Sequence, residues 1–443
     1  MKKCPICERR VMMDEALFCP YCGNAFPASD SFCVNCGSRL QADYDFCPLC
    51  GTRVNGEIAG SPFYEMENEL HVHHWLDYGE SNLYRDYNVK SRDAFSYCLR
   101  DSRPNDLRLI RKFKLEPDTV YYVTADIRTD GVVNHENSAD PIGACISTSH
   151  FYCSRSLFGT CGWQTVGVLG RSDESGVLEV SFNLGYYFNT CSGTAWFENL
   201  RFISTERYFN GDNTWRFLAV ILRDTGIDTL DPDTGERIRL SHKPSVAERD
   251  ALKNSLRGFE RDLTKDAEGL FRVKVDIVEP TAKCDSYTKN GFGYTLTAPS
   301  AREYLAENGI DISGYDHVIM IACLPELPAN YFGLGGLCID GKIGYSFVLH
   351  RDVQNCIEYL NGRRPGSRWP SALYVHEFFH SIEACSRALG LDIPEVDGAR
   401  EGYSDREEYR DWYRDFIKKN IGKSGEKRGA DPRLWRLRPS LFR

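Results

Sequence analysis

The most informative stretch of the chain runs from Pro370 to Gly390 and reads PSALYVHEFFHSIEACSRALG. Pro370 suits the first turn of a helix, and Gly390 suits the position just beyond its end. Apolar side chains recur at helical spacing and predict a face buried in a core. They are Tyr374, Phe378, Ile382, Cys385 and Leu389. A second face carries His376, His380 and Glu383 at positions i, i+4 and i+7. The sequence therefore predicts a helix that packs by one face and presents two imidazoles on another.

The spacing of the two histidines has a chemical reason. Two imidazoles one helical turn apart can bind one zinc ion and leave positions for a carboxylate and a water. Glu377 directly follows the first histidine, where a general base can take a proton from that water. The pattern predicts a catalytic zinc bound by His376 and His380, with Glu377 as the catalytic base.

This segment resembles the active-site helix of the zincin superfamily of zinc metallopeptidases. The resemblance implies hydrolysis of a peptide or protein substrate. It departs from the metzincin subgroup, which has glycine and histidine where this chain has Glu383 and Ser386. The third zinc ligand must therefore come from elsewhere. Asp397 is the first choice, because the chain can return to the helix after the turn at Gly390. An aspartate in that role is similar in kind to the one that aspzincins use.

Three glutamates are the alternatives to Asp397 as the third ligand. They are Glu383, Glu395 and Glu401. Glu383 can instead orient a ligand by hydrogen bonding. Tyr403 is either an oxyanion donor or a structural tyrosine, and the structural role is favoured.

The rest of residues 207–443 alternates between strand and helix patterns and predicts a mixed α/β domain. Strands are expected at 217–222, 271–278 and 317–324, and helices at 247–263 and 297–308. Asp340-Gly341 predicts a hairpin within 333–349. Its glycine-rich first strand is either a plain sheet edge or an edge that accepts an extended peptide. Residues 416–443 carry nine Lys/Arg against two acidic residues and are expected to be a solvated end.

Eight cysteines form four Cys-x-x-Cys pairs in the first 50 residues. Two residues between paired thiolates let both sulfurs bind one ion, and four thiolates satisfy tetrahedral zinc. The eight candidate ligands are Cys4, Cys7, Cys19, Cys22, Cys33, Cys36, Cys47 and Cys50. The repeat resembles a tandem zinc ribbon over residues 1–55. The resemblance implies two structural zinc ions. The nearly balanced charge of the module disfavours nucleic acid and favours protein contacts.

Residues 62–206 show short runs of β-branched and aromatic residues between turns, and predict a jelly-roll β-sandwich. The segment from Cys191 to Phe202 resembles the last strand of galactose-binding-like domains, including carbohydrate-binding modules. A glycan or a protein is therefore a candidate ligand of this domain. Its aromatics either stack on a sugar or pack within the sandwich, and packing is favoured. They include Trp163, Tyr186 and Tyr187. The histidines at 71–74 have no carboxylate or cysteine at a suitable spacing. We therefore expect surface or core histidines there rather than metal ligands.

The composition bears on three further properties: nucleic-acid binding, membrane association and cellular location. The net charge of -9 disfavours nucleic acid and anionic membranes as partners. We expect no membrane span, because no run of about 18 apolar residues occurs. Free cysteines and metal-type pairs predict a cytoplasmic protein. The sequence thus predicts a multidomain zinc metallopeptidase. The alternative is a non-catalytic protein- or glycan-binding protein with a silent zincin domain.

Overall fold

The computed structural model describes six short strand segments before residue 82 and most of residues 82–442. Within that range the undescribed positions are 137–140, 150–151, 188, 209–211, 330–331, 340–342, 351–370, 401, 405–408 and 423–426. Several residues named above lie outside the described residues. They are Cys4, Cys7, Cys19, Cys22, Cys33, Cys36, Cys47, Cys50, Asp340, Gly341, Pro370 and Glu401.

Two antiparallel strand pairs occur in the N-terminal module, and each brackets the first Cys-x-x-Cys pair of one repeat. The first pair joins β1 (Lys2–Lys3) to β2 (Arg10–Val11). The second joins β3 (Ser31–Phe32) to β4 (Arg39–Leu40). The two repeats therefore share one local strand arrangement.

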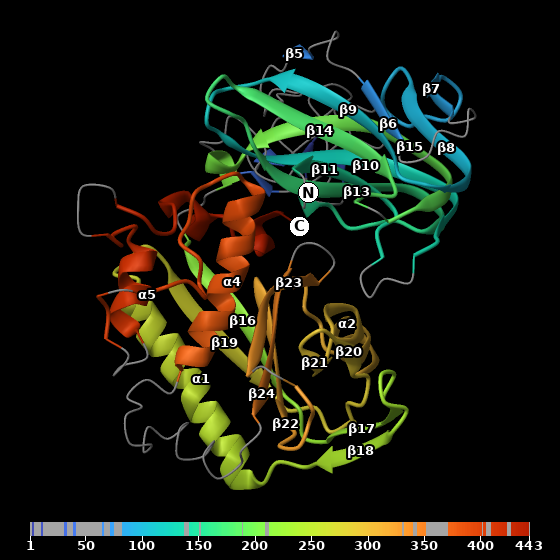
Figure 1. Cartoon of the computed structure of the whole chain (residues 1–443). Helices are drawn as coiled ribbons and strands as arrows, with labels where there is room; N and C mark the ends of the chain where they lie inside the picture. Colours follow the sequence, from blue (N-terminus) through green and yellow to red (C-terminus); the bar gives the residue numbers. More distant parts are fainter. Residues whose placement is uncertain are drawn as a thin grey trace.

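Two antiparallel sheets form the β-sandwich at the top of Figure 1. In order, the first contains β13 (Gly159–Arg171), β10 (Val120–Asn134), β15 (Cys191–Ser204), β8 (Ser96–Asn105) and β7 (Asn82–Asp86). The second contains β12 (Tyr152–Cys153), β11 (Ala144–Ser149), β14 (Val177–Leu184), β9 (Leu107–Lys114) and β5 (Tyr64–Glu65), and β6 (His71–His74) also pairs with β9. Buried side chains of the two sheets, such as Phe182 and Phe197, stack between them. The predicted sandwich is confirmed.

A five-stranded mixed sheet forms the centre of the C-terminal half, after the short 3-10 turn η2 (Thr205–Tyr208). In order, its strands are β19 (Arg272–Val278), β16 (Thr214–Ile221), β22 (His317–Cys323), β24 (Ile343–His350) and β23 (Gly333–Ile339). The first four are parallel, and β23 is the antiparallel edge. Every residue of β22 and β24 is buried, as expected for central parallel strands.

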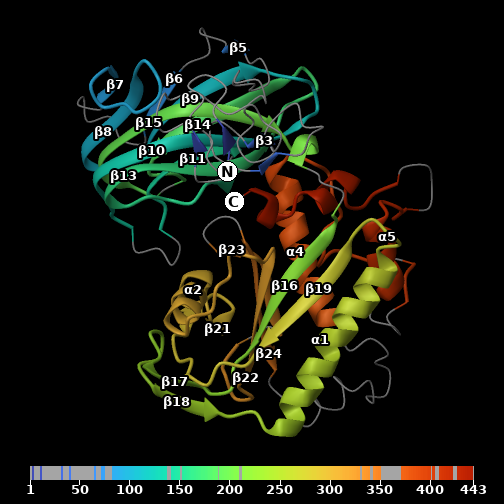
Figure 2. The same cartoon turned by 180° about the vertical axis from the view of Figure 1, so that it is seen from behind.

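Helices cover both faces of this sheet (Figures 1 and 2). One face packs against α1 (Val246–Asp266) and α4 (Ala372–Ala388). The other packs against α2 (Ala298–Glu307) and lies near two hairpins. The hairpins are β17 (Thr225–Leu230) with β18 (Arg237–His242), and β20 (Thr288–Asn290) with β21 (Gly293–Thr295). The predicted helices at 247–263, 297–308 and 370–390 thus correspond to α1, α2 and α4.

The C-terminal segment corrects one prediction, because the expected solvated end is packed into the core. It contains α5 (Arg410–Ile417), η4 (Pro432–Arg436) and η5 (Pro439–Phe442). Trp435 is fully buried, stacks on Phe271 with ring centroids 4.5 Å apart, and donates a hydrogen bond to the Ile417 carbonyl. The charge count missed this because Leu434 and Trp435 are apolar anchors between arginines, whose long side chains reach solvent.

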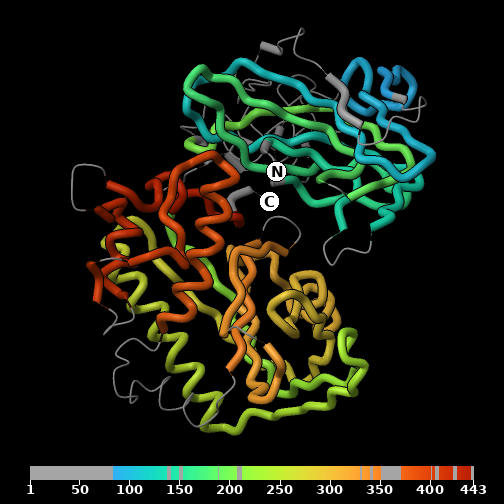
Figure 3. The backbone as a smooth tube through the Cα atoms, in the orientation of Figure 1, coloured from blue at the N-terminus to red at the C-terminus, as the bar shows by residue number. Residues whose placement is uncertain are grey.

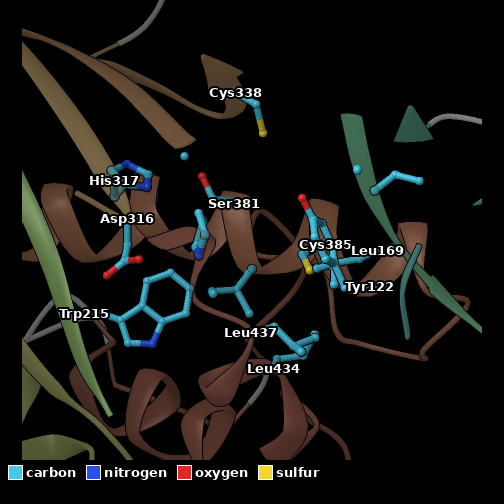
Figure 4. A pocket seen from close by; sticks show the side chains of 15 residues that line it. Tyr122, Leu169, Trp215, Asp316, His317, Cys338, Ser381, Cys385, Leu434 and Leu437 are labelled. Carbon is cyan, nitrogen blue, oxygen red and sulfur yellow. The ribbon is translucent and has the colours of Figure 1, made fainter. Parts of the chain in front are cut away.

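The sandwich and the C-terminal half share buried surface. Val120, Leu169 and Ile203 of the sandwich belong to the same core cluster as α1 and α4. The C-terminal segment returns to the sandwich (Figure 3). Its Arg433 forms an ion pair with Asp118 of the sandwich. A cavity of about 70 Å³ lies at this junction, and its wall is drawn in Figure 4. Its lining includes Tyr122, Leu169, Trp215, Ser381, Cys385 and Leu437.

None of the helices in the described part of the chain combines the length and apolar character needed to cross a bilayer.

Candidate metal and catalytic site

Helix α4 brings the two predicted histidine ligands together. The Nε2 atoms of His376 and His380 lie 3.2 Å apart, and both side chains are about one-fifth to one-quarter exposed. The opposite face of α4 anchors the helix, because Tyr374, Phe378 and Ile382 are buried in the core. The helix therefore fixes the imidazoles at the surface of a rigid support.

The loop after α4 adds Asp397 to the pair, as the sequence predicted for the position of this residue. Gly390 has a φ of +62° and ends the helix with a left-handed turn, which lets the chain reverse. Asp397 Oδ1 lies 3.2 Å from His376 Nε2, and its Oδ2 lies 3.6 Å from His380 Nε2. The Asp397 side chain is 75% exposed, so this third group lies on the solvent side of the two imidazoles.

The geometry of these three groups fits a zinc ion. Donors at about 2.0–2.1 Å from a tetrahedral zinc lie roughly 3.3 Å from one another. His376 Nε2 lies 3.2 Å from both His380 Nε2 and Asp397 Oδ1, and His380 Nε2 lies 3.6 Å from the second carboxylate oxygen, Asp397 Oδ2. Within the described residues, His376, His380 and Asp397 form the one group of three potential ligands that lie this close together. Two imidazoles and a carboxylate are a donor set that zinc prefers.

The second nitrogen of each imidazole has its own partner. His380 Nδ1 lies 3.1 Å from Glu383 Oε2, and His376 Nδ1 lies 2.8 Å from the Tyr413 hydroxyl. An imidazole whose Nδ1–H donates to such a group presents the Nε2 lone pair to a metal. Glu383, an alternative third ligand in the sequence, therefore acts in this structure as a hydrogen-bond partner of His380.

The electrostatics of the two imidazoles differ. Burial, with the neighbouring His380, lowers the pKa of His376 to about 4, which favours its neutral, metal-binding form. Burial also opposes protonation of His380. The hydrogen bond that His380 Nδ1–H donates to Glu383, together with the nearby carboxylates of Glu377 and Asp397, outweighs it and raises the pKa of His380. Two imidazoles this close favour at most one proton between them.

Glu377 lies beneath the edge strand of the sheet. Its side chain is 3% exposed, and burial raises its pKa to about 8. A β-carbon at Gly333 would overlap the Glu377 carboxylate, and one at Gly335 would overlap the Glu377 backbone. Gly336 likewise lies against His380. The glycines of β23 therefore allow the strand to cross directly over α4, which the sequence alone did not reveal.

Of the remaining candidates, Glu395 and Tyr403 have partners other than the three donors. Glu395 contacts Arg387 at 3.4 Å and is 72% exposed. The Tyr403 hydroxyl donates to Asp415 Oδ2 at 2.9 Å, which is the favoured structural role. Glu401 lies outside the described residues.

Two residues of this site were missed in the sequence. Tyr413 approaches from α5 and contacts His376, and Arg400 donates to the Tyr413 hydroxyl at 3.1 Å. Arg400 follows Asp397 by three residues, and Tyr413 lies in an aromatic pair with Trp412. Nothing in those local patterns indicates that the loop and α5 meet behind His376.

A second hollow, of about 460 Å³, lies between the outer face of the second sandwich sheet and the end of α4. Its lining is mainly polar, with Arg108, Ser147, Arg171, Asp173, Glu179, Ser181 and Tyr186. The Arg108 guanidinium lies 4.6 Å from the centre of the Tyr186 ring, and Tyr186 is 3% exposed. Trp163 and Tyr187 are partly buried. Tyr186 is therefore buried against Arg108 in the wall of this hollow, outside the apolar core between the two sheets.

Comparison with protein families matches residues 4–51 to the double zinc ribbon. This match confirms the ribbon prediction and supports structural zinc in the N-terminal module. The comparison with curated proteins gives no match.

Solved structures similar to the chain include carbohydrate-binding modules. A family 16 module is 13% identical, with 29% of this chain and 90% of that one covered and a TM-score of 0.20. A xylan-binding domain of family 22 is 9% identical, with 33% and 96% covered and a TM-score of 0.22. A tailspike protein of bacteriophage CBA120 is 8% identical, with 30% of this chain covered and a TM-score of 0.21. The match spans 19% of the tailspike chain. These TM-scores are too low to support an argument about function. The functional proposals below therefore rest on the residues of this chain.

Proposed function

We propose that this chain is a zinc metallopeptidase, a hydrolase in which His376, His380 and Asp397 bind the catalytic zinc and Glu377 is the general base. The observation that carries the proposal is the approach of two imidazole nitrogens and one carboxylate. His376 Nε2 lies 3.2 Å from His380 Nε2 and from Asp397 Oδ1, and His380 Nε2 lies 3.6 Å from Asp397 Oδ2. That spacing matches the edge of a zinc coordination tetrahedron. The buried carboxyl group of Glu377 on the same helix supports the assignment of a proton acceptor.

Each residue has a defined task in this proposal. A zinc ion bound there would act as a Lewis acid and lower the pKa of its water. Glu377 accepts a proton from that water and later delivers it to the leaving amine. Tyr413 and Glu383 hold the two imidazoles in the tautomer that leaves each Nε2 free to bind. The exposed side of Asp397 leaves the site accessible to substrate.

The edge strand β23 supports an extended peptide as substrate. Within the described residues, β23 pairs with β24 on one side, and no described strand pairs with its other edge. An exposed edge offers backbone N–H and C=O groups to an added strand. Because Gly333 and Gly335 bring this strand onto α4, a peptide bound along it would pass beside Glu377.

Exposed apolar side chains near β23 support a preference for apolar residues in that peptide. Phe332 precedes β23 and is 66% exposed, and Leu337 within it is 43% exposed. Phe292, 60% exposed, is next to Gly293, which forms a bridge with Ala329 just before the strand. We expect Phe332→Ser to lower kcat/KM for peptides with large apolar side chains more than for peptides without them. Equal effects on both groups would contradict this preference.

A peptide library derived from a digested proteome tests the proposed activity. Zinc-loaded wild type should generate new peptide termini, and Glu377→Gln should retain its zinc but generate none. Glu395→Gln, at an exposed position on the same loop as Asp397, is the matched control and should cleave normally. Equal cleavage by the wild type and by Glu377→Gln would contradict the mechanism.

The two other modules would then direct the enzyme to its targets. We propose that the eight cysteines of residues 4–51 bind two structural zinc ions, in two sets of four. Nine cysteines after the ribbons are free thiols in the described residues, which supports a reducing, cytoplasmic location.

A non-catalytic binding protein is the second candidate function. The polar hollow beside β9, β11 and β14 favours it, because hydroxyl, carboxylate and guanidinium groups line one concave face, as recognition of a glycan requires. Calorimetry with xylan and galactan oligosaccharides tests this alternative, with Glu179→Ala and Ser181→Ala as variants of the hollow. Binding by the wild type together with an inactive zinc site would favour it over the peptidase.

A further inference from the structure

Arg400 contacts structural elements that hold two of the three candidate zinc ligands. Its Nη2 donates to the hydroxyl of Tyr413 at 3.1 Å and to the carbonyl of Val396 at 2.5 Å. Tyr413 contacts the Nδ1 of His376, and Val396 immediately precedes Asp397 in the chain. One guanidinium therefore spans the space between the helix ligand and the loop ligand.

The guanidinium is held by aromatic rings rather than by a carboxylate. Its Cζ lies 4.8 Å from the ring centre of Tyr409, 4.7 Å from that of Trp412 and 4.9 Å from that of Tyr413. Among the described residues, no carboxylate forms an ion pair with Arg400. Cation–π contacts keep the charge in place without supplying a negative group that would compete for the metal. The planar fork can donate in two directions at once, which a lysine ammonium cannot reproduce with the same geometry.

The hydrogen bonds have a defined direction when the imidazole binds a cation. His376 must then carry its proton on Nδ1 and donate it to the Tyr413 oxygen, 2.8 Å away. Arg400 donates to the same oxygen. Two donors directed at one phenol oxygen fix its position, and that position fixes the plane of the His376 ring.

We propose that Arg400 and Tyr413 are positioning residues that align His376 and Asp397 for zinc binding. This inference rests on the proposed zinc site. It adds that Arg400 couples the loop ligand to the helix ligand, so that the two are assembled together. Arg400 acts through Tyr413 and the Val396 peptide, and its Nη2 also lies 3.5 Å from His376 Nδ1, on the side of the ring away from the metal-binding Nε2.

Zinc affinity measured by competition with a chromophoric chelator tests this role without relying on activity. We expect Tyr413→Phe to weaken binding at the catalytic site about 10–100-fold, the usual effect of removing a partner of a ligand histidine. Arg400→Gln should weaken it at least as much, because it frees both ligands. Arg400→Lys should recover only part of the loss. Tyr403→Phe is the matched control, because its hydroxyl bonds to Asp415 and not to a ligand.

The double variant Tyr413→Phe/Arg400→Gln separates a shared pathway from two independent effects. If Arg400 acts partly through Tyr413, the combined loss in affinity is smaller than the product of the single losses. Unchanged zinc affinity in Tyr413→Phe and Arg400→Gln, with melting temperatures near that of the wild type, would overturn the proposal. A wild type with no zinc beyond that of the ribbons would instead refute the proposed function. If Arg400→Gln fails to fold, Tyr413→Phe carries the test, because it removes one hydroxyl and keeps the ring.

Discussion

At the scale of single residues, the site depends on the small size of two glycines as well as on the chemical groups of the histidines and Glu377. In the proposed site the two histidines would supply metal donors and Glu377 the base, and Gly333 and Gly335 let the edge strand lie against the same helix. A glycine needed for close approach of two backbones has no substitute, because any β-carbon occupies the space of the neighbouring group. The contact between β23 and α4 therefore depends both on the reactive side chains of α4 and on the glycines of β23.

Gly333→Ala should displace either β23 or the Glu377 carboxylate. We expect a loss of about 1–3 kcal/mol in the free energy of unfolding, as for overpacked positions, and a reduced peptidase rate. Denaturant unfolding and the peptide assay measure the two effects. Gly314→Ala is the control, because a β-carbon there meets no atom within 4 Å. A Gly333→Ala variant as stable and as active as Gly314→Ala would show that the close contact has no role.

The sequence predicted which residues form the candidate site, but it did not predict the residues that pack around them. His376, His380 and Glu377 follow from helical spacing, and the approach of Asp397 follows from the turn at Gly390. Tyr413 and Arg400 could not be predicted, because their contacts depend on how α5 packs behind α4. Periodicity describes which face of an element is buried and does not identify the residues that will meet it.

At the scale of elements, the central strands are buried on both faces, and β22 carries a histidine into that environment. His317 is fully buried, and its Nε2 lies 2.7 Å from the Ser346 hydroxyl on β24. Burial lowers the pKa of His317 to about 3. The folded state therefore disfavours protonation, so this contribution to stability is complete above pH 6.5 and falls as the pH drops toward 3.

His317→Gln should remove this contribution to acid sensitivity. Between pH 7 and pH 4, the free energy of unfolding of the wild type should fall by about 3 kcal/mol more than that of the variant. Other titrating groups are common to both proteins and cancel in the difference. Denaturant titrations at a series of pH values give the comparison. Parallel curves for the two proteins would mean that His317 is protonated with its usual pKa in the fold.

The C-terminal segment shows where charge patterns mislead. Its arginines and lysines suggested a solvated end, but Trp435 fills the space between Phe271 and Phe379. A single large apolar residue can outweigh several charges, because full burial of an aromatic ring contributes about 1.5–3 kcal/mol whereas exposed charges cost little. The anchors were in the sequence, but nothing there identified the pocket that receives them.

Trp435→Ala should therefore destabilise the C-terminal half strongly. We expect a loss of about 3–5 kcal/mol in the free energy of unfolding, from lost burial and the cavity left behind. Arg436→Ala, at the exposed neighbouring position, should change stability little. Thermal and denaturant unfolding compare the two variants. Similar stability of both would contradict the packing of this segment.

At the scale of the whole molecule, the sandwich and the C-terminal half form a shared core. The sequence predicted the sandwich and the mixed sheet separately, because each has its own strand pattern. It did not predict that Leu169 and Ile203 of the sandwich pack with the helices of the other half. Contacts between such units depend on surface shape, which the patterns within each unit do not encode.

Leu169→Ala tests this shared core. Because Leu169 packs in the cluster that contains α1 and α4, the variant should lower the transition temperature of both halves together. The expected loss is about 2–5 kcal/mol in the free energy of unfolding. Scanning calorimetry distinguishes one joint unfolding transition from two separate ones. A shift confined to a separate sandwich transition would show that the two halves unfold independently.

The zinc content of the purified full-length chain tests the catalytic-zinc assignment most directly. Elemental analysis of the wild type should give three zinc ions per chain, two from the ribbon cysteines and one from the site on α4. The variant His376→Ala/His380→Ala should give two. A wild type with two ions, unchanged in that variant, would contradict the assignment of a catalytic zinc to His376, His380 and Asp397.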